Sequence, residues 1–271
     1  MSSGDAGVDL RLVEVGDADS THAIERLFME VWRREHPPVS GDILQALLLA
    51  GNYVAAAHME NEMVGAAVGF LGHGPGRPLH LHSHIMGVKP GLQVQGVGFA
   101  LKQHQRRWAL AAGLGTVTWT FDPLVRRNAF FNVTKLGATV SGYHVNLYGA
   151  MGDGINGDGD SDRLEVDWAL ESPAAVAAAA GSPSVPDLAA ARAAGAVEVL
   201  RDVDGAPRTQ PLSGDVVLCQ VPEDIVAVRR QDPAVARAWR LAVRDTIGAA
   251  LGQGWTVDGM SRDGWFVLRR G

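Results

Sequence analysis

The chain of 271 residues contains one cysteine, Cys219, so it cannot form a disulfide within itself. A single thiol also excludes a zinc site built from several cysteines, and it is typical of a reducing compartment. A basic surplus is lacking as well, because 24 Lys and Arg stand against 30 Asp and Glu, which gives a formal charge of −6. This balance disfavours bulk binding of nucleic-acid phosphates, although a local basic patch is compatible with it.

Long hydrophobic runs are also missing. No stretch reaches the roughly 18 uninterrupted apolar residues that a membrane span needs, and residues 1–7 lack the basic and apolar parts of a secretory signal. We therefore expect a cytoplasmic protein with no membrane partner. Hydrophobic residues make up 46% and charged residues 20%, a globular balance, and the length fits one large or two modest domains.

The apolar pattern predicts an α/β fold with a mixed sheet. Apolar and polar residues alternate over Val8–Val15, which predicts a strand, and apolar positions recur every three or four residues over Ser20–Arg34, which predicts a helix. Tyr53–Met59 and Met63–His73 are predicted to form a hairpin. Further strands are expected at 79–88, 116–122, 138–148 and 164–170, and further helices at 41–50, 96–114 and from 125.

A change of composition suggests the domain boundary. Residues 171–195 are rich in Ala and Pro, which is typical of a linker. We therefore expect a first domain over 8–170 and a smaller α/β domain over 196–271. The tail repeats the order helix, strand, strand predicted for 125–170, which leaves open that it is a degenerate half-copy of the first domain.

A glycine motif follows the strand predicted at 79–88. Gln93, Gly96 and Gly98 fit the pattern Gln/Arg-x-x-Gly-x-Gly/Ala at the start of a helix. Glycines let backbone amides approach an anion closely, and a helix N-terminus adds free N–H groups and a favourable dipole. A tight strand-to-helix turn without a ligand is the alternative. The Gly-Lys-Ser/Thr ending of a P-loop and the Gly-x-Gly-x-x-Gly spacing of a dinucleotide site are both absent.

With this motif the chain resembles the GNAT superfamily of acyl-CoA-dependent N-acyltransferases. The resemblance covers residues 8–170 in element order, and within the superfamily a bacterial group of predicted acetyltransferases is most similar. It shares with that group LHSHIMGV (Leu81–Val88), WTFDPLVRRNA (Trp119–Ala129), LYG (Leu147–Gly149) and SDR (Ser161–Arg163).

The resemblance implies a mostly antiparallel sheet flanked by helices, and acetyl-CoA or another acyl-CoA as cosubstrate. The backbone of Met86, Gly87 and Val88 would bind the pantetheine arm. The pyrophosphate would be held by a stretch comprising Gln93, Val94, Gln95, Gly96, Val97 and Gly98.

Histidines occupy the strand before this motif. Many members of the superfamily place a carboxylate base eleven residues before the motif's Gln or Arg, and His82 stands there. Counting by two puts His80, His82 and His84 on one face together with Met86 and Val88. His82 or His84 is expected to take the proton of the attacking amine. Packed histidines without a catalytic role and a strand-histidine zinc site are the alternatives.

One departure concerns the proton donor. Many members place a Tyr at the position of Val133 to protonate the leaving thiolate, and valine cannot donate a proton. Tyr143 and Tyr148 are candidate substitutes. The departure motivates an alternative function, a CoA-binding or CoA-sensing protein with weak catalysis.

The acceptor is expected to be a small amine. Asp122 is a candidate contact for an amine or a cap for the next helix, and Arg163 is a candidate clamp for a carboxylate or a partner of Asp160 or Asp162.

Overall fold

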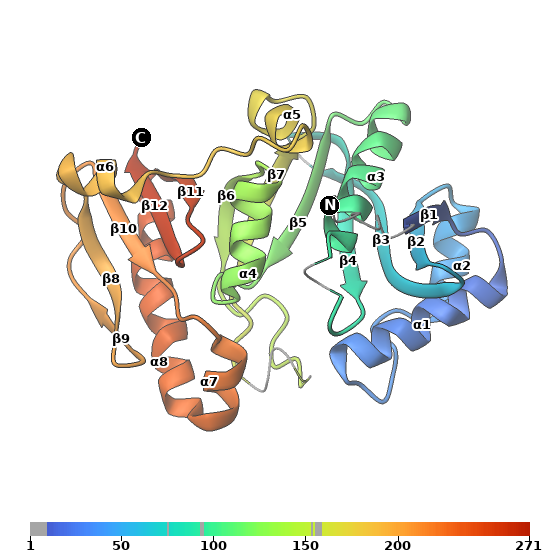
Figure 1. Ribbon diagram of the computed structural model, residues 1–271, viewed down its shortest axis with the longest axis horizontal. Coiled ribbons are helices and arrows are strands. Elements are labelled where there is room, and N and C mark those ends of the chain that lie inside the picture. Colours follow the sequence, from blue (N-terminus) through green and yellow to red (C-terminus); the bar gives the residue numbers. More distant parts are fainter. Residues whose placement is uncertain (1–9, 75, 93–94, 153, 155–158) are drawn as a thin grey trace, which may run out of the picture. The chain divides into compact units, whose positions relative to one another are not determined.

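The computed structural model describes residues 10–74, 76–92, 95–152, 154 and 159–271 (Figure 1). The chain divides into two compact units, Met1–Val117 and Thr118–Gly271, and the division falls within strand β5 (Thr116–Phe121).

The first unit is built on four antiparallel strands that are neighbours in chain order. They are β1 (Leu10–Glu14), β2 (Tyr53–Met59), β3 (Glu62–Gly74) and β4 (Arg77–Val88). The helices are α1 (Ala18–Trp32), α2 (Gly41–Leu49) and α3 (Val97–Ala111). Asp17 caps α1, because its Oδ1 accepts a hydrogen bond of 2.8 Å from the amide of Ser20.

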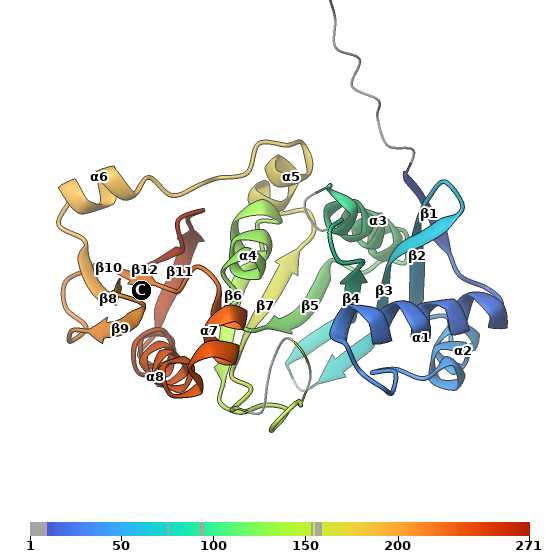
Figure 2. The same cartoon turned by 60° about the horizontal axis from the view of Figure 1, so that its bottom comes forward.

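Helices cover both faces of these strands. On one face Ile24 and Phe28 of α1 pack with Val54 and Val68 in a buried cluster. On the other face α3 lies close to the sheet, since a Cβ on Gly65 would come within 3.1 Å of the side chains of Val97 and Leu101. Figure 2 shows α1 and α3 on opposite sides of the strands.

The second unit contains two groups of strands. Strands β5, β7 (Arg163–Ala169) and β6 (Thr139–His144) are neighbours in that order. A five-stranded sheet has the order β11 (Trp255–Met260), β12 (Trp265–Arg270), β10 (Val216–Gln220), β8 (Val197–Val203) and β9 (Ala206–Thr209). The helices are α4 (Arg126–Ala129), the π-helix η1 (Phe130–Lys135), α5 (Pro173–Ala179), α6 (Leu188–Ala193), α7 (Ile225–Gln231), α8 (Pro233–Val243), the π-helix η2 (Arg244–Gly248) and α9 (Ala249–Gly252).

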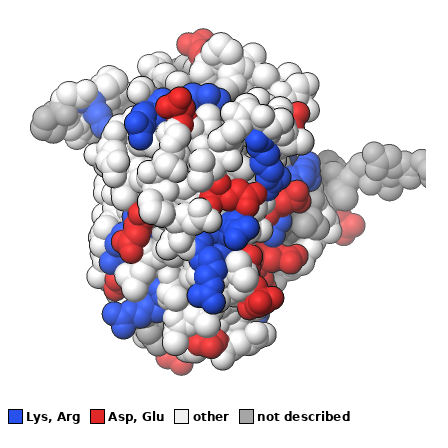
Figure 3. Space-filling view, turned by 90° about the vertical axis from the view of Figure 1, so that its left-hand side faces the viewer, with Lys and Arg blue, Asp and Glu red and all other residues white. Residues whose placement is uncertain are grey.

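The surface around β8 carries charges of both signs. Glu198 pairs with Arg192 of α6 at 2.9 Å and with Arg201 at 3.7 Å. Figure 3, which views the side of the molecule on the left in Figure 1, shows basic and acidic side chains close together. This face therefore presents no extended surface of a single sign.

The expected fold class is confirmed. Both units mix helices with mostly antiparallel strands, and a second, smaller sheet occupies the C-terminal region. The segment 171–195 contains α5, whose Ala175 and Ala178 are buried, and α6, which has no buried residue. The domain boundaries drawn from composition, and the half-copy hypothesis, stay predictions. None of the helices in the described ranges is both long enough and apolar enough to cross a membrane.

Candidate functional site

Strand β4 contains a β-bulge beside its histidines. Its pairing with β3 matches Val68 to Ile85 and the next β3 residue, Gly69, to Ser83, so His84 is the extra residue on β4. A bulge interrupts the alternation of side chains between the two faces of a sheet. Residues before and after His84 therefore do not follow one period of two.

The prediction that the strand histidines share a face with Met86 and Val88 is consequently wrong. Both of these side chains lie on the α3 side, because a Cβ on Gly98 of α3 would be 3.6 Å from Met86 Cε and 3.8 Å from Val88 Cγ2. His82 pairs with Phe70, which follows Val68 by two positions on regular β3 and so shares the face that packs on α1. The imidazole of His82 thus lies on the opposite side of the strand from Met86.

His82 and His84 lie around one aromatic ring. The centroid of the Phe70 ring is 5.1 Å from that of His82 and 5.6 Å from that of His84, and the two imidazoles are 6.4 Å apart. Desolvation lowers the pKa of His84, although its side chain keeps access to solvent. The structure brings the two predicted bases together, and their catalytic role stays a prediction.

His80 is held elsewhere. Its buried ring donates a hydrogen bond of 2.9 Å from Nδ1 to the carbonyl oxygen of Pro78. Over the described ranges no three His, Cys, Asp or Glu side chains lie close enough to share a metal ion. The geometry therefore does not support the strand-histidine zinc site.

The turn after β4 presents the N-terminus of α3. Gly96 precedes the helix with φ 84°, in the left-handed region that favours glycine. The amide of Ala100 donates to the carbonyl of Gly96 at 2.9 Å, so the amides of Val97 and Gly98 belong to the first turn, which has no acceptor within the helix. No acidic side chain lies in that turn. The helix N-terminus therefore favours an anion.

The two glycines of the motif differ in what they require. Gly96 needs its positive φ, and nothing lies within 4 Å of the position of an added Cβ. Gly98 has no such φ, and an added Cβ would meet Met86 and Val88 at ordinary contact distances. Two further predicted phosphate contacts, Gln93 and Val94, lie outside the described residues.

Lys102 of α3 was not predicted from the sequence. It is 4% exposed, and its Nζ donates to Ser83 Oγ on β4 at 2.8 Å and to Gln105 Oε1 at 2.9 Å. Burial lowers the pKa of Lys102 to about 7. Because Ser83 precedes the bulged residue His84, Lys102 fastens α3 to the part of β4 that carries the predicted bases.

Asp122 of the second unit lies in a buried ion cluster. Arg240 donates to its carboxylate with Nη1 at 2.8 Å and Nη2 at 2.7 Å, Arg229 contacts it at 2.5 Å, and the amide of Leu124 donates to it at 3.0 Å. Burial alone would raise the pKa of Asp122, but the neighbouring guanidinium groups hold it well below its ordinary value. Asp122 thus organises the turn that follows β5, without acting as the N-cap of α4.

Arg163 is buried in the same cluster. Its Nη1 lies 3.7 Å from Asp122 Oδ2 and donates to the carbonyl of Asp162 at 3.2 Å, while Nη2 donates to Met151 Sδ at 2.8 Å. The guanidinium carbon is 5.7 Å from the centroid of the Tyr148 ring. These contacts favour a structural role for Asp122 and Arg163. Their roles in binding an acceptor stay predictions.

A second acidic centre lies beside the first. Arg244 donates to Asp162 from Nε at 2.9 Å and from Nη2 at 2.8 Å, and the hydroxyl of Tyr143 donates to Asp162 at 2.7 Å. Arg240 and Arg244 are four positions apart and bind different carboxylates, Asp122 and Asp162. The sequence carries no signal for these partners, which lie some 80 to 120 positions away.

Residues 21–137 match the acetyltransferase (GNAT) family. This range includes most of α1, the predicted bases on β4, and the glycine motif at the start of α3. No curated protein matches the chain.

Several solved structures are similar over part of the chain. The ribosomal-protein-S18-alanine N-acetyltransferase of Escherichia coli shares 15% identity over 60% of this chain and 95% of its own, with a TM-score of 0.49. YncA, a putative acetyltransferase of Salmonella typhimurium solved with acetyl-CoA, is 17% identical over 61% of this chain and 97% of its own, with a TM-score of 0.47. An N-acetyltransferase of Staphylococcus aureus is 14% identical over 60% of this chain and 99% of its own, with a TM-score of 0.48. At these scores the likenesses add nothing about activity.

Proposed function

Because residues 21–137 match the acetyltransferase (GNAT) family, we propose that the protein transfers an acyl group from acetyl-CoA or another acyl-CoA to a small amine. The observation that carries the proposal is the family match across β4 and the start of α3, where Gly96 opens a helix N-terminus and the amides of Val97 and Gly98 have no acceptor within the helix. Such a terminus suits the pyrophosphate of CoA.

The chain offers backbone groups for both parts of the cosubstrate. The proposed pantetheine contacts are the main-chain groups of Met86, Gly87 and Val88. The proposed pyrophosphate contacts are Gln95, Gly96, Val97 and Gly98, together with the neighbouring Gln93 and Val94. The absence of an acidic side chain in the first turn of α3 supports this assignment, because a carboxylate there would repel a diphosphate.

The proposed reaction is direct transfer. The amine nitrogen attacks the thioester carbonyl, a C–N bond forms, the C–S bond breaks, and CoA leaves as the thiolate. His82 or His84 accepts the proton that the nitrogen loses, a contribution typically worth about 10² to 10⁴ in rate. The lowered pKa of His84 supports this role, because a neutral imidazole can accept a proton.

The acceptor is proposed to be a small amine, without a named contact. Asp122 and Arg163 are predicted acceptor contacts, but both are buried and bonded within one ion cluster. We therefore do not assign the specificity of the reaction to them.

Calorimetry with CoA, run beside a transfer assay, tests the proposal. The transfer assay supplies acetyl-CoA and a panel of primary amines, and it measures release of the CoA thiol. We expect saturable binding of CoA and amine-dependent thiol release. A chain that is folded but binds neither CoA nor acetyl-CoA contradicts the proposal.

Val133 supports a second candidate, CoA binding or sensing with little transfer. This residue is buried in η1 and has no proton to give. Of the three tyrosines in the chain, Tyr143 is engaged with Asp162. CoA binding without thiol release for any amine in the panel identifies this second function.

A further inference from the structure

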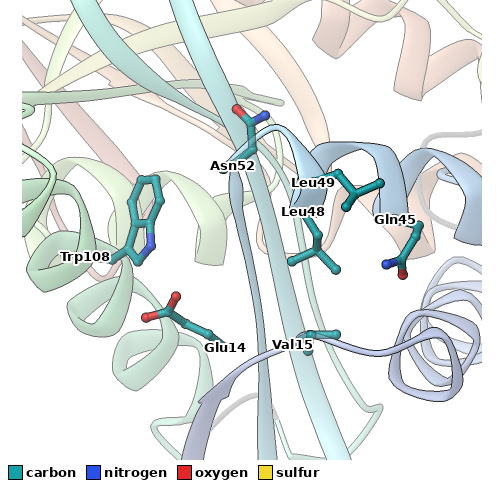
Figure 4. Close-up of a pocket in the computed structure, with 9 residues that line it drawn as sticks. Glu14, Val15, Gln45, Leu48, Leu49, Asn52 and Trp108 are labelled. Atoms are coloured by element: carbon teal, nitrogen blue, oxygen red, sulfur yellow. The ribbon is translucent and has the colours of Figure 1, made fainter.

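A pocket of about 340 Å³ lies in the first unit where β1 ends and β2 begins (Figure 4). Its walls come from the end of β1, the second half of α2, the turn before β2, and Trp108 of α3. Strands β2 and β3 stand between β1 and β4 in the sheet order. The pocket is therefore separate from the predicted bases on β4.

The charge of the pocket comes from Glu14. Among the described residues that line the pocket, Glu14 is the one with a charged side chain, and it is exposed to solvent. A single carboxylate at the mouth of a pocket favours a cationic ligand over a neutral or anionic one.

The indole of Trp108 forms the wall next to Glu14. Its ring is half-buried and packs edge-on against Tyr53, with centroids 5.3 Å apart and an interplanar angle of 63°. This contact holds the indole in place, and Figure 4 shows the Glu14 carboxylate close to it. A carboxylate beside an aromatic ring is a combination that recognises organic ammonium groups.

Gln45 provides a second polar point. Its Oε1 is buried and is among the described side-chain atoms for which no hydrogen-bond partner is found. Because this oxygen is out of reach of water, a ligand can meet it only when the Gln45 amide turns toward the pocket. The bond to a ligand N–H would then remove the cost of a buried acceptor without a donor. Figure 4 shows Leu48 and Val15 between Glu14 and Gln45, so the surface between the two polar points is apolar.

We propose that this pocket binds a short aliphatic diamine. One ammonium group lies between Glu14 and the indole of Trp108, and the methylene chain covers Leu48 and Val15. The second nitrogen donates to Gln45 Oε1 after the amide of that side chain turns into the pocket. The proposal stands independently of acyl transfer, since it concerns a different part of the first unit.

His104 provides a readout of occupancy. Its Nδ1 lies 2.9 Å from the hydroxyl of Tyr53. Burial and the charge of Arg107 lower the pKa of His104, and the charge of Glu14 opposes them. A cation bound at Glu14 cancels that opposition, so the pKa of His104 should fall further when the diamine binds.

The experiment measures binding of 1,5-diaminopentane to the full chain by calorimetry and follows the His104 ring by NMR titration. Glu14→Gln should weaken binding by about ten- to a hundredfold, because a charged hydrogen bond is lost. The matched control is Asp42→Asn, which removes an exposed carboxylate of α2 outside the pocket and should leave affinity unchanged. 1,5-Pentanediol, which is neutral and of equal length, should not bind.

Four results would overturn the site. They are no binding of the diamine by the wild type at millimolar concentration, equal binding by Glu14→Gln, equal binding of the diol, and binding without a shift of the His104 pKa. Gln45→Leu gives a second test, because it removes the acceptor and keeps the size of the side chain. Thermal unfolding of each variant separates lost binding from lost folding.

Discussion

At the scale of single residues, His82 and His84 are distinguished by their neighbours. Both contact the Phe70 ring, but His82 is paired in the regular part of β4 and His84 is the bulged residue. The bulge lets two histidines that are two positions apart approach the same ring while Met86 lies on the other side. Replacing either histidine should therefore change the rate of proton transfer and leave the backbone that is proposed to hold CoA nearly unchanged.

His82→Ala should lower kcat of acyl transfer by about 10² to 10⁴ and leave the Kd for CoA within about twofold, because a base acts on the amine and not on the cosubstrate. Steady-state kinetics and calorimetry on the same preparation measure both quantities. His80→Ala is the matched control, since its ring is turned to Pro78. Unchanged turnover for His82→Ala would remove that residue from the mechanism.

The pH profile tests His84 separately. Desolvation holds its pKa below the ordinary 6.5, so the imidazole is neutral, and able to accept a proton, at lower pH than an ordinary histidine. If His84 is the base, kcat/KM should fall only below pH 6.5, and His84→Ala should abolish that acidic limb. A limb that is the same in the variant would assign the base role elsewhere.

The buried amine of Lys102 should make the stability of the protein depend on pH. Its pKa is about 7 in the folded chain and 10.5 as an ordinary lysine, so the unfolded chain binds one more proton between these values. Stability from this group therefore rises as pH increases from about 7 to about 10. Urea unfolding of wild type and Lys102→Met should show that rise in the wild type alone. Parallel pH curves for the two proteins would contradict the burial of a titrating amine.

At the scale of elements, the turn into α3 contains two glycines with different roles. Gly96 supplies the left-handed backbone, whereas an added Cβ at Gly98 would face Met86 and Val88 of β4 at ordinary contact distances. The two glycines should therefore respond differently to substitution.

Gly98→Ala should leave stability unchanged or raise it by about 0.5–1 kcal/mol, as expected for glycine to alanine in a helix. It should weaken CoA binding about tenfold or more, because the added methyl group narrows the space between α3 and the proposed cosubstrate contacts at Met86 and Val88. Gly115→Ala is the control, because nothing lies within 4 Å of an added Cβ at Gly115, which follows α3. Equal loss of affinity in both variants, or in neither, would contradict the assignment of the pyrophosphate.

Some features of these elements could be predicted from the sequence and others could not. The apolar runs Tyr53–Met59 and Met63–His73, separated by three polar residues, correctly predicted the hairpin of β2 and β3, because such a short turn is decided locally. The glycine pattern correctly placed a helix start near Gly96. The bulge at His84 was missed, because it is a property of the pairing between β3 and β4 and leaves no period of its own in the sequence. The face assigned to the histidines was wrong for that reason.

At the scale of the whole molecule, the C-terminal helices contribute charges to the buried centre of the second unit. Arg229 of α7 and Arg240 of α8 both bind Asp122, which follows β5. Thr134 Oγ1 of η1 also donates to the carbonyl of Met260 on β11 at 2.6 Å. Segments more than 100 positions apart are thus joined by buried polar contacts, which no local pattern of residues could predict.

Asp122→Asn should cost about 3–5 kcal/mol of unfolding free energy, because buried guanidinium groups lose their counter-charge. The carboxylate has a folded pKa below its ordinary 3.8, so it stabilises the fold above about pH 4 and loses that effect as the pH falls further. Urea unfolding at pH 7 and pH 3 should show a smaller difference between the two proteins at pH 3.

Asp258→Asn is the comparison, since it breaks an exposed ion pair with Arg269. That change should cost at most about 1 kcal/mol. A similarly small effect of Asp122→Asn would mean that the cluster does not stabilise the second unit.

The single thiol of the chain has a practical consequence. Cys219 is fully buried in β10, and burial raises its pKa to about 12, so the native protein should react only slowly with maleimides. A cysteine introduced at Leu49, which is 84% exposed on the rim of the diamine pocket, would then accept a fluorophore selectively. Its emission could follow ligand entry in real time, without first replacing the native cysteine.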